Sequence, residues 1–65
     1  MSEGYTLLRR VSAFLNEAEM PPSLFGREAV RDPQFVFDLR RGRNPGRKVV
    51  TRADAYMQAW RNEHR

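Results

Sequence analysis

The sequence predicts an all-α domain built from four helices. Apolar residues recur at spacings of three and four in four separate stretches, which is the periodicity of a helix with one buried face. Clusters of proline and glycine separate these stretches at 20–23 and at 42–46. At 65 residues the chain forms a single domain, which buries only about 60% of the surface that its unfolded form exposes. We therefore expect marginal stability and short helices that depend on one another.

The first helix is predicted from Tyr5 or Thr6 to Glu19. Its apolar residues form one broad stripe, and neither glycine nor proline interrupts it. The stripe contains Leu7, Leu8, Val11, Phe14, Leu15 and Ala18. The sequence Met20-Pro21-Pro22-Ser23 ends this helix, because the residue before a proline is displaced from the α region. Residues 1–4 are expected to be disordered.

The second helix is predicted to open with Pro22 near its first position, where the missing N–H of proline costs nothing. Phe25, Ala29 and Val30 line its apolar face. Gly26 lies inside this helix, where glycine costs about 1 kcal/mol relative to alanine. We interpret it as a close approach to the backbone of the third helix, with an incidental glycine as the alternative.

The third helix is predicted at about 33–41. The carboxylate of Asp32 can cap its first turn, and Pro33 can occupy its first position. The apolar positions are Phe35, Val36 and Leu39. Gly42 is expected to end the helix, as a glycine just past the last turn often does. The second and third helices together form a tight corner and need flanking helices to bury their apolar faces.

The fourth helix is predicted from Thr51 to about Asn62, after a connector at 42–50. Thr51 resembles an N-cap with Asp54 three residues on, an approximate capping box. One helical face carries Ala53, Tyr56, Met57 and Trp60. We interpret this face as core, with a dimer contact as the alternative for Trp60. Residues 63–65 are expected to be disordered.

Composition excludes several classes of site. The chain has no cysteine and one histidine, His64, so neither a disulfide nor a thiolate metal site is possible. No pair of carboxylates, no nucleophile beside a base and no metal-ligand spacing is present, and we expect neither an enzyme, a cofactor nor a small-molecule substrate. No apolar run is long enough to cross a membrane, and the N-terminus lacks the features of a signal peptide. A cytoplasmic location is expected.

The charge is concentrated in one segment. The formal net charge is +4, yet no acidic residue lies between Asp38 and Asp54, a segment that carries six basic residues. They are Arg40, Arg41, Arg43, Arg47, Lys48 and Arg52. The rest of the chain has a balance of −2. A basic segment on a slightly acidic body is typical of a surface that binds a polyanion, although a solvated loop is the simpler alternative.

The order of the helices predicts how DNA would be bound. In a helix-turn-helix the second helix enters the major groove, where each base pair displays a distinct pattern, and neighbouring segments contact phosphates. The residues predicted to face base edges are Pro33, Gln34, Phe37, Asp38 and Arg41. The residues predicted to contact phosphates are Ser23, Arg40, Arg43, Arg47 and Lys48. Double-stranded DNA is therefore the expected partner.

The predicted base contacts differ in chemistry and in their alternatives. The amide of Gln34 can pair with adenine through two hydrogen bonds. Phe37 can touch a thymine methyl group, or it can make a dimer or inter-helix contact. Asp38 can accept from cytosine N4, or it can instead hold Arg41 or a neighbouring arginine in place. Arg41 can reach a guanine or a phosphate.

The run from Phe25 to Pro45 resembles the helix-turn-helix of the lambda-repressor-like (Cro/C1-type) DNA-binding domains. Phe25-Gly26 matches the family's leucine–alanine pair, Asp32 its capping serine and Val36 the isoleucine in the middle of the third helix. Gly42-Arg43 with Pro45 matches the ending. The resemblance implies a small bacterial or phage transcriptional regulator, in which the start of the third helix reads bases. Val30 stands where the family's turn glycine is usual, and proline occupies a position where the family often has a base-reading glutamine.

Two other functions fit the same features. A small helical adaptor could use the basic segment to bind an acidic protein partner, with Phe37 or Trp60 as its anchor. RNA binding is the third possibility, but the aromatic residues are not spaced as a platform on which bases stack. For DNA binding we expect a homodimer on a palindromic or repeated site, because one module makes few base contacts.

Overall fold

A computed structural model of the chain describes residues 3–64. Within this part the chain forms four helices and no strand, which confirms the prediction of an all-α domain. The helices are α1 (Glu3–Ala18), α2 (Pro22–Val30), α3 (Phe35–Arg40) and α4 (Arg47–Glu63).

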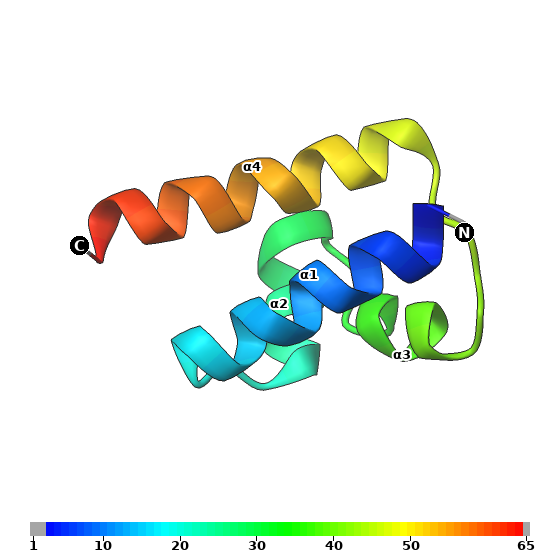
Figure 1. Cartoon of the computed structure of the whole chain (residues 1–65), viewed down its shortest axis with the longest axis horizontal. Helices are drawn as coiled ribbons and strands as arrows, with labels where there is room; N and C mark the ends of the chain where they lie inside the picture. Colours follow the sequence, from blue (N-terminus) through cyan, green and yellow to red (C-terminus); the bar gives the residue numbers. More distant parts are fainter. Residues whose placement is uncertain (1–2, 65) are drawn as a thin grey trace.

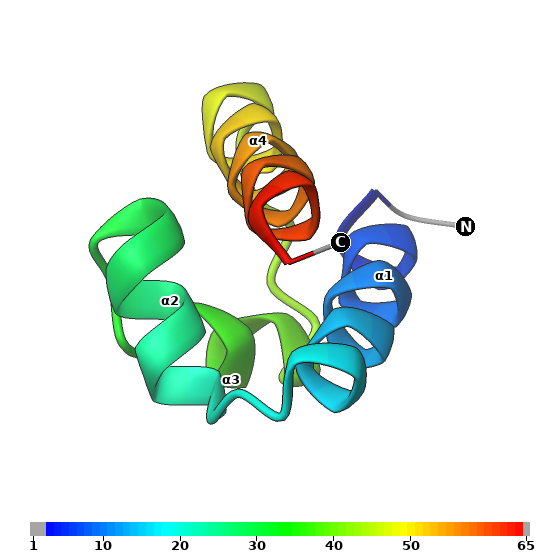
Figure 2. The same ribbon diagram turned by 90° about the vertical axis from the view of Figure 1, so that its left-hand side faces the viewer.

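The helices enclose one core (Figure 1). Seen along the molecule, α2, α3 and α1 form three sides of the domain, and α4 lies over the fourth (Figure 2). The short α3 packs against both α1 and α2, whereas α4 packs against α2. The connector between α3 and α4 rises along one end of the molecule (Figure 1). The outward sides of α3 and α4 therefore point in opposite directions.

The core contains most of the apolar residues that the periodicity predicted, together with Val50, which it did not; Leu8, Ala18, Tyr56 and Trp60 are only partly buried and pack against the core. Phe14 and Phe25 are fully buried, and their ring centroids lie 5.6 Å apart. The buried residues are Leu7, Val11, Phe14, Leu15, Phe25, Ala29, Val30, Phe35, Val36, Leu39, Val50, Ala53 and Met57. Phe35 thus packs in the core, and Val50 joins it from a segment that the sequence assigned to a connector.

Helix α1 begins earlier than expected. Glu3 and Gly4, predicted to be disordered, belong to its first turn, while Met1 and Ser2 lie outside the described residues. The backbone N–H of Gly4 donates to Asn44 Oδ1 at 3.2 Å, which ties the start of α1 to the connector. A Cβ at Gly4 would lie 2.8 Å from the carbonyl oxygen of Arg43, so the absence of a side chain allows this contact.

The corner between α2 and α3 turns on Arg31, which has φ 58° and ψ 34°. The residue of the corner with a left-handed conformation is therefore Arg31. Val30, which stands where the resemblance led us to expect a turn glycine, is the buried last residue of α2. Gly26 makes the close approach that its place inside a helix predicted. An added Cβ there would lie 2.2 Å from the carbonyl oxygen of Asp32 and 3.3 Å from Phe35 Cβ. The Asp32 N–H donates to the Gly26 carbonyl at 3.0 Å and closes the corner.

Helix α3 is shorter than predicted at its start. The Asp32 carboxylate accepts from the Gln34 N–H at 3.0 Å, as a cap would, but the helix itself begins at Phe35. The reason is that the Asp32 carbonyl accepts from the Phe35 N–H at 3.0 Å, which makes residues 32–35 a tight turn rather than the first turn of an α-helix. Gly42 follows the end of α3 with φ 93°, which confirms its role at that end.

The prediction that α4 starts at Thr51 is wrong, because α4 begins at Arg47. Gly46 is the extended N-cap residue, and its carbonyl accepts from the Val50 N–H at 3.1 Å. Thr51 therefore lies inside the helix, and no capping box forms with Asp54. Burial of Val50 against the core stabilises this extra turn. Glu63, expected to be disordered, ends α4, while Arg65 lies outside the described residues.

Side-chain contacts join α4 to α1. Asp54 pairs with Arg10 at 3.0 Å, and Arg61 pairs with Glu17 at 3.0 Å. Trp60 is partly buried, with its ring centroid 5.3 Å from that of Phe14, which supports its interpretation as part of the core. Its ring also stacks on His64 at 3.9 Å. Burial raises the pKa of Tyr56, and the charges of Glu28 and Glu63 raise it further.

Candidate nucleic-acid interface

The residues predicted to read bases lie along α3 and the turn before it. Pro33 and Gln34 are exposed in that turn, and Arg41 is exposed just after the last residue of α3. Phe37 and Asp38 are half-buried. The opposite side of α3 is occupied by buried Phe35, Val36 and Leu39, so its exposed and buried sides are clearly separated.

Phe37 is less available than its neighbour Gln34. The guanidinium carbon of Arg40 lies 5.6 Å from the centroid of the Phe37 ring, a cation–π contact on the surface of α3. A half-buried ring with a cation over one face can offer only its remaining edge to a partner. Because Arg40 belongs to α3 itself, this contact leaves open whether Phe37 meets a base, a second copy or another helix.

Asp38 is paired with Arg43. Its Oδ2 lies 3.0 Å from Arg43 Nη1, with the Asp38 side chain 24% exposed and the Arg43 side chain 71% exposed. The backbone adds a second link, since the Arg43 N–H donates to the Asp38 carbonyl at 3.1 Å. Of the two roles considered for Asp38, the structure supports the one in which it holds a neighbouring arginine. That arginine is Arg43 rather than Arg41.

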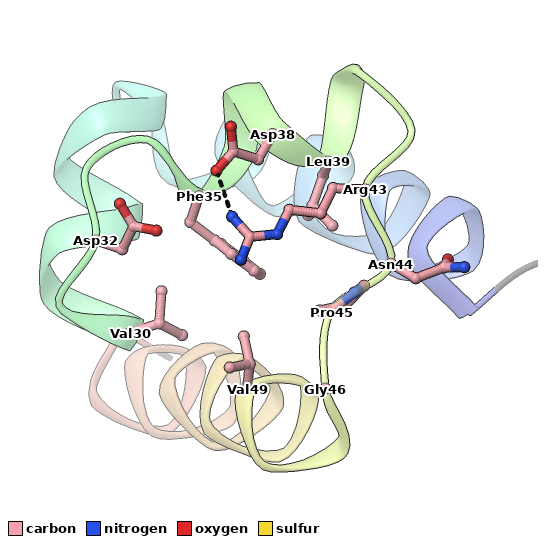
Figure 3. Close-up of a pocket in the computed structure, with 10 residues that line it drawn as sticks. All are labelled: Val30, Asp32, Phe35, Asp38, Leu39, Arg43, Asn44, Pro45, Gly46 and Val49. Atoms are coloured by element: carbon pink, nitrogen blue, oxygen red, sulfur yellow. Dashed lines mark hydrogen bonds and ion pairs between the residues drawn. The ribbon is translucent and has the colours of Figure 1, made fainter.

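This ion pair lies beside a small cavity of about 120 Å³ between α3, the connector and the first turn of α4 (Figure 3). The side chain of Arg43 extends from the connector back toward α3 (Figure 3). Apolar side chains from three helices line the cavity, namely Val30, Phe35, Leu39 and Val49. Periodicity within single helices gives no sign of such a cavity, because it exists only where three helix ends meet.

Two of the predicted phosphate contacts lie near the start of α2. Ser23 is exposed in the first turn of α2, whose N-cap residue, Pro21, supplies no side-chain hydrogen bond. Arg40 lines a hollow together with Pro22, next to Ser23 in the chain, and with residues at the end of α1. The fold thus brings Arg40 near Pro22 at the start of α2, although the two residues are 18 positions apart in the sequence. We refer to Ser23 and Arg40 as the corner group.

The other three predicted phosphate contacts lie at the opposite end. Arg43 belongs to the connector, and Arg47 and Lys48 open α4, all three exposed. We refer to them as the connector group. In Figure 1 the start of α2 and the connector lie on opposite sides of α3. The structure therefore does not gather the predicted phosphate contacts into one patch: Ser23 lies at the start of α2, Arg40, the last residue of α3, lines a hollow with Pro22, and the connector group lies at the other end.

Most cations of the basic segment lack a carboxylate partner within the described residues. Arg43 pairs with Asp38, whereas Arg41, Arg47, Lys48 and Arg52 make no ion pair in this part of the chain. Arg47 and Lys48 also lie at the positive end of the α4 dipole, and no acidic residue offsets them in that turn. Their charge does not stabilise the helix, which favours a role toward an external anion.

Comparison of the chain with protein-family models, with curated proteins and with solved structures finds no match. Between residues 3 and 64, no helix has the length and apolar character that crossing a bilayer requires.

Proposed function

We propose that this chain binds double-stranded DNA in a sequence-specific manner and acts as a small transcriptional regulator. In this proposal α2 and α3 form a helix-turn-helix of the lambda-repressor-like type, and α3 enters the major groove. The observation that carries the proposal is that the start of α2, beside which Arg40 lies, and the connector, which carries Arg43, lie on opposite sides of α3. A helix lying in the major groove has a phosphate backbone on each side, so contacts are needed in both directions.

The turn before α3 supplies the base contacts that the geometry favours. Gln34 is exposed there, and its amide can present both a donor and an acceptor to adenine. Pro33 packs beside it against a base edge, and Arg41 reaches a guanine or a phosphate at the other end of α3. Phe37 contributes the edge of its ring that Arg40 leaves uncovered.

The proposal includes a homodimer on a palindromic or repeated site. Helix α3 has only six residues, so a single copy of the protein reads few base pairs. Two copies joined by symmetry double the number of base contacts and fix the distance between half-sites.

The first experiment is selection from random 30-base-pair duplexes at two salt concentrations, followed by sequencing of the retained DNA. We expect a consensus with two related half-sites. Steeply salt-dependent retention without a consensus would contradict sequence-specific reading by α3. Absence of retention at low salt would contradict DNA binding altogether and would favour an adaptor for an acidic protein.

Two variants then separate base reading from phosphate contact. Gln34→Ala should change the selected sequence, because a paired amide is worth about 1–3 kcal/mol of discrimination between bases. Arg47→Ala should weaken binding to all sequences alike and should reduce the salt slope by about 0.9. Arg9→Ala on the exposed face of α1 is the matched control, with little expected change. If Gln34→Ala and Arg47→Ala weaken every sequence equally, the assignment of base reading to α3 is wrong.

A further inference from the structure

The ion pair between Asp38 and Arg43 joins a residue expected to face bases to one expected to hold a phosphate. We propose that Asp38 acts as an internal competitor of the DNA phosphate for Arg43, and so sets how strongly the connector group grips the DNA backbone. This proposal rests on the proposed function. It makes Asp38 a positioning residue and removes it from base reading.

The geometry of the pair is fixed by the chain itself. Arg43 follows the left-handed Gly42, whose N–H donates to the Leu39 carbonyl at 3.0 Å. This turn directs the chain back along α3, and the Arg43 N–H reaches the Asp38 carbonyl at 3.1 Å. The Arg43 guanidinium then lies beside the Asp38 carboxylate, with Arg43 Nη1 3.0 Å from Asp38 Oδ2. Backbone and side-chain contacts with Asp38 thus hold Arg43 in place, and the hydrogen bond from the Gly4 N–H to Asn44 ties the next residue to α1.

The pair is also weak enough to exchange. The Arg43 side chain is 71% exposed, and exposed ion pairs contribute little because water screens the charges. A DNA phosphate offers the guanidinium an equivalent acceptor. Arg43 can therefore leave Asp38 for a phosphate, but the binding free energy is reduced by the pair that is given up. The other two members of the connector group, Arg47 and Lys48, have no such competitor within the described residues.

Removal of the competitor should strengthen binding without changing sequence preference. Asp38→Asn keeps the shape of the side chain and removes its charge, which leaves Arg43 available to a phosphate. Arg43 then binds its phosphate without first giving up an exposed ion pair, so we expect a gain in affinity of roughly 1.4- to fivefold, while the number of phosphate contacts and hence the salt slope stay about the same. The gain should be the same for a selected site and for random DNA.

The test measures binding of fluorescent 30-base-pair duplexes, one selected and one random, by anisotropy across a series of salt concentrations. The proteins are the wild type, Asp38→Asn, Arg43→Gln and the double variant. If Asp38 acts through Arg43, Asp38→Asn should gain affinity in the wild-type background and should gain none when Arg43 is replaced. Asp54→Asn is the matched control, since it breaks an ion pair of the same length between α1 and α4 and removes the same charge.

The outcomes separate this inference from the proposed function. Failure of the wild type to bind either duplex at low salt would overturn both. Wild-type binding that Asp38→Asn leaves unchanged, or that Asp54→Asn strengthens equally, would overturn the role of Asp38 alone. A changed sequence preference in Asp38→Asn would make Asp38 a base-reading residue, and an equal gain with Arg43→Gln would show that its charge acts directly on DNA.

Discussion

Arg31 carries the most informative backbone conformation in the chain. With φ 58° and ψ 34° it occupies the left-handed region, which costs a residue with a Cβ about 1–2 kcal/mol. Two hydrogen bonds hold it there, from the Arg31 N–H to the Arg27 carbonyl at 3.1 Å and from the Asp32 N–H to the Gly26 carbonyl at 3.0 Å. The direction in which α3 leaves α2 therefore depends on a strained residue.

Arg31→Gly should stabilise the protein. Glycine removes the strain, and its greater freedom in the unfolded chain takes back part of the gain, so we expect about 0.5–1 kcal/mol. For a domain of this size that is a rise in Tm of roughly 3–6 °C, measured by thermal unfolding followed by circular dichroism. Arg27→Gly is the matched control: Arg27 is exposed inside α2, four residues before Arg31, and its replacement should cost about 1 kcal/mol. A loss of stability in Arg31→Gly would contradict the left-handed assignment.

For single residues, the sequence predicted what kind of contact a side chain can make better than it predicted which neighbouring residue makes that contact. Charge and spacing identified Asp38 as a residue that could either read cytosine or hold an arginine, and only the path of the chain after Gly42 brings Arg43 to it. Contacts of this kind depend on side-chain directions at a helix end, which periodicity does not determine.

Among the elements, the corner between α2 and α3 has the closest backbone approach. The position that an added Cβ at Gly26 would occupy lies 2.2 Å from the Asp32 carbonyl oxygen, a backbone atom that cannot rotate away. Gly26→Ala should therefore push α2 and the corner apart. We expect a loss of about 3 kcal/mol or more, at or above the upper end of the range for overpacking, measured by urea unfolding.

Gly46→Ala is the matched control for that substitution. Gly46 is the N-cap of α4 at φ −72°, and an added Cβ there would meet no atom within 4 Å. The free energy of unfolding of Gly46→Ala should differ from that of the wild type by less than about 0.5 kcal/mol. Equal effects of the two substitutions would mean that Gly26 is an incidental glycine rather than a close contact.

The start of α4 explains where prediction of the elements failed. Thr51 and Asp54 have the residue types and the spacing of a capping box, but Gly46 after Pro45 provides an earlier start. Val50 continues the apolar face of Ala53 and Met57 by one helical step, and its burial favours the longer helix. The burial of Val50 in the core therefore determines where α4 begins, and the capping pattern of Thr51 and Asp54 does not.

At the scale of the whole molecule, the fold separates what the sequence places together. The basic segment is continuous in the sequence, yet α3 and α4 lie on opposite sides of the core, with the connector between them (Figure 2). The outward face of α4 therefore points away from α3, and Arg52, one helical turn beyond Lys48, lies farther along α4 from the connector. A DNA duplex against α3 would meet the corner group and the first turn of α4 rather than all six cations.

This arrangement limits the number of phosphates that one copy can neutralise. The four cations in the two groups are Arg40, Arg43, Arg47 and Lys48, which corresponds to a slope of log K against log salt of about −3.6 per copy. A homodimer on one duplex should give about −7. The slope should be measured by anisotropy between 50 and 300 mM salt, a range of about sixfold in ionic strength that resolves these values.

Sedimentation of the same complexes then counts the copies on each duplex, which fixes the slope per copy. Two copies with a total slope near −7 would support a homodimer in which each copy uses its corner and connector groups. One copy with a slope near −3.6 would support DNA binding and contradict the dimer. A slope steeper than about −5 per copy would require more cations than the side of α3 provides, and would contradict the orientation in which α3 faces the duplex.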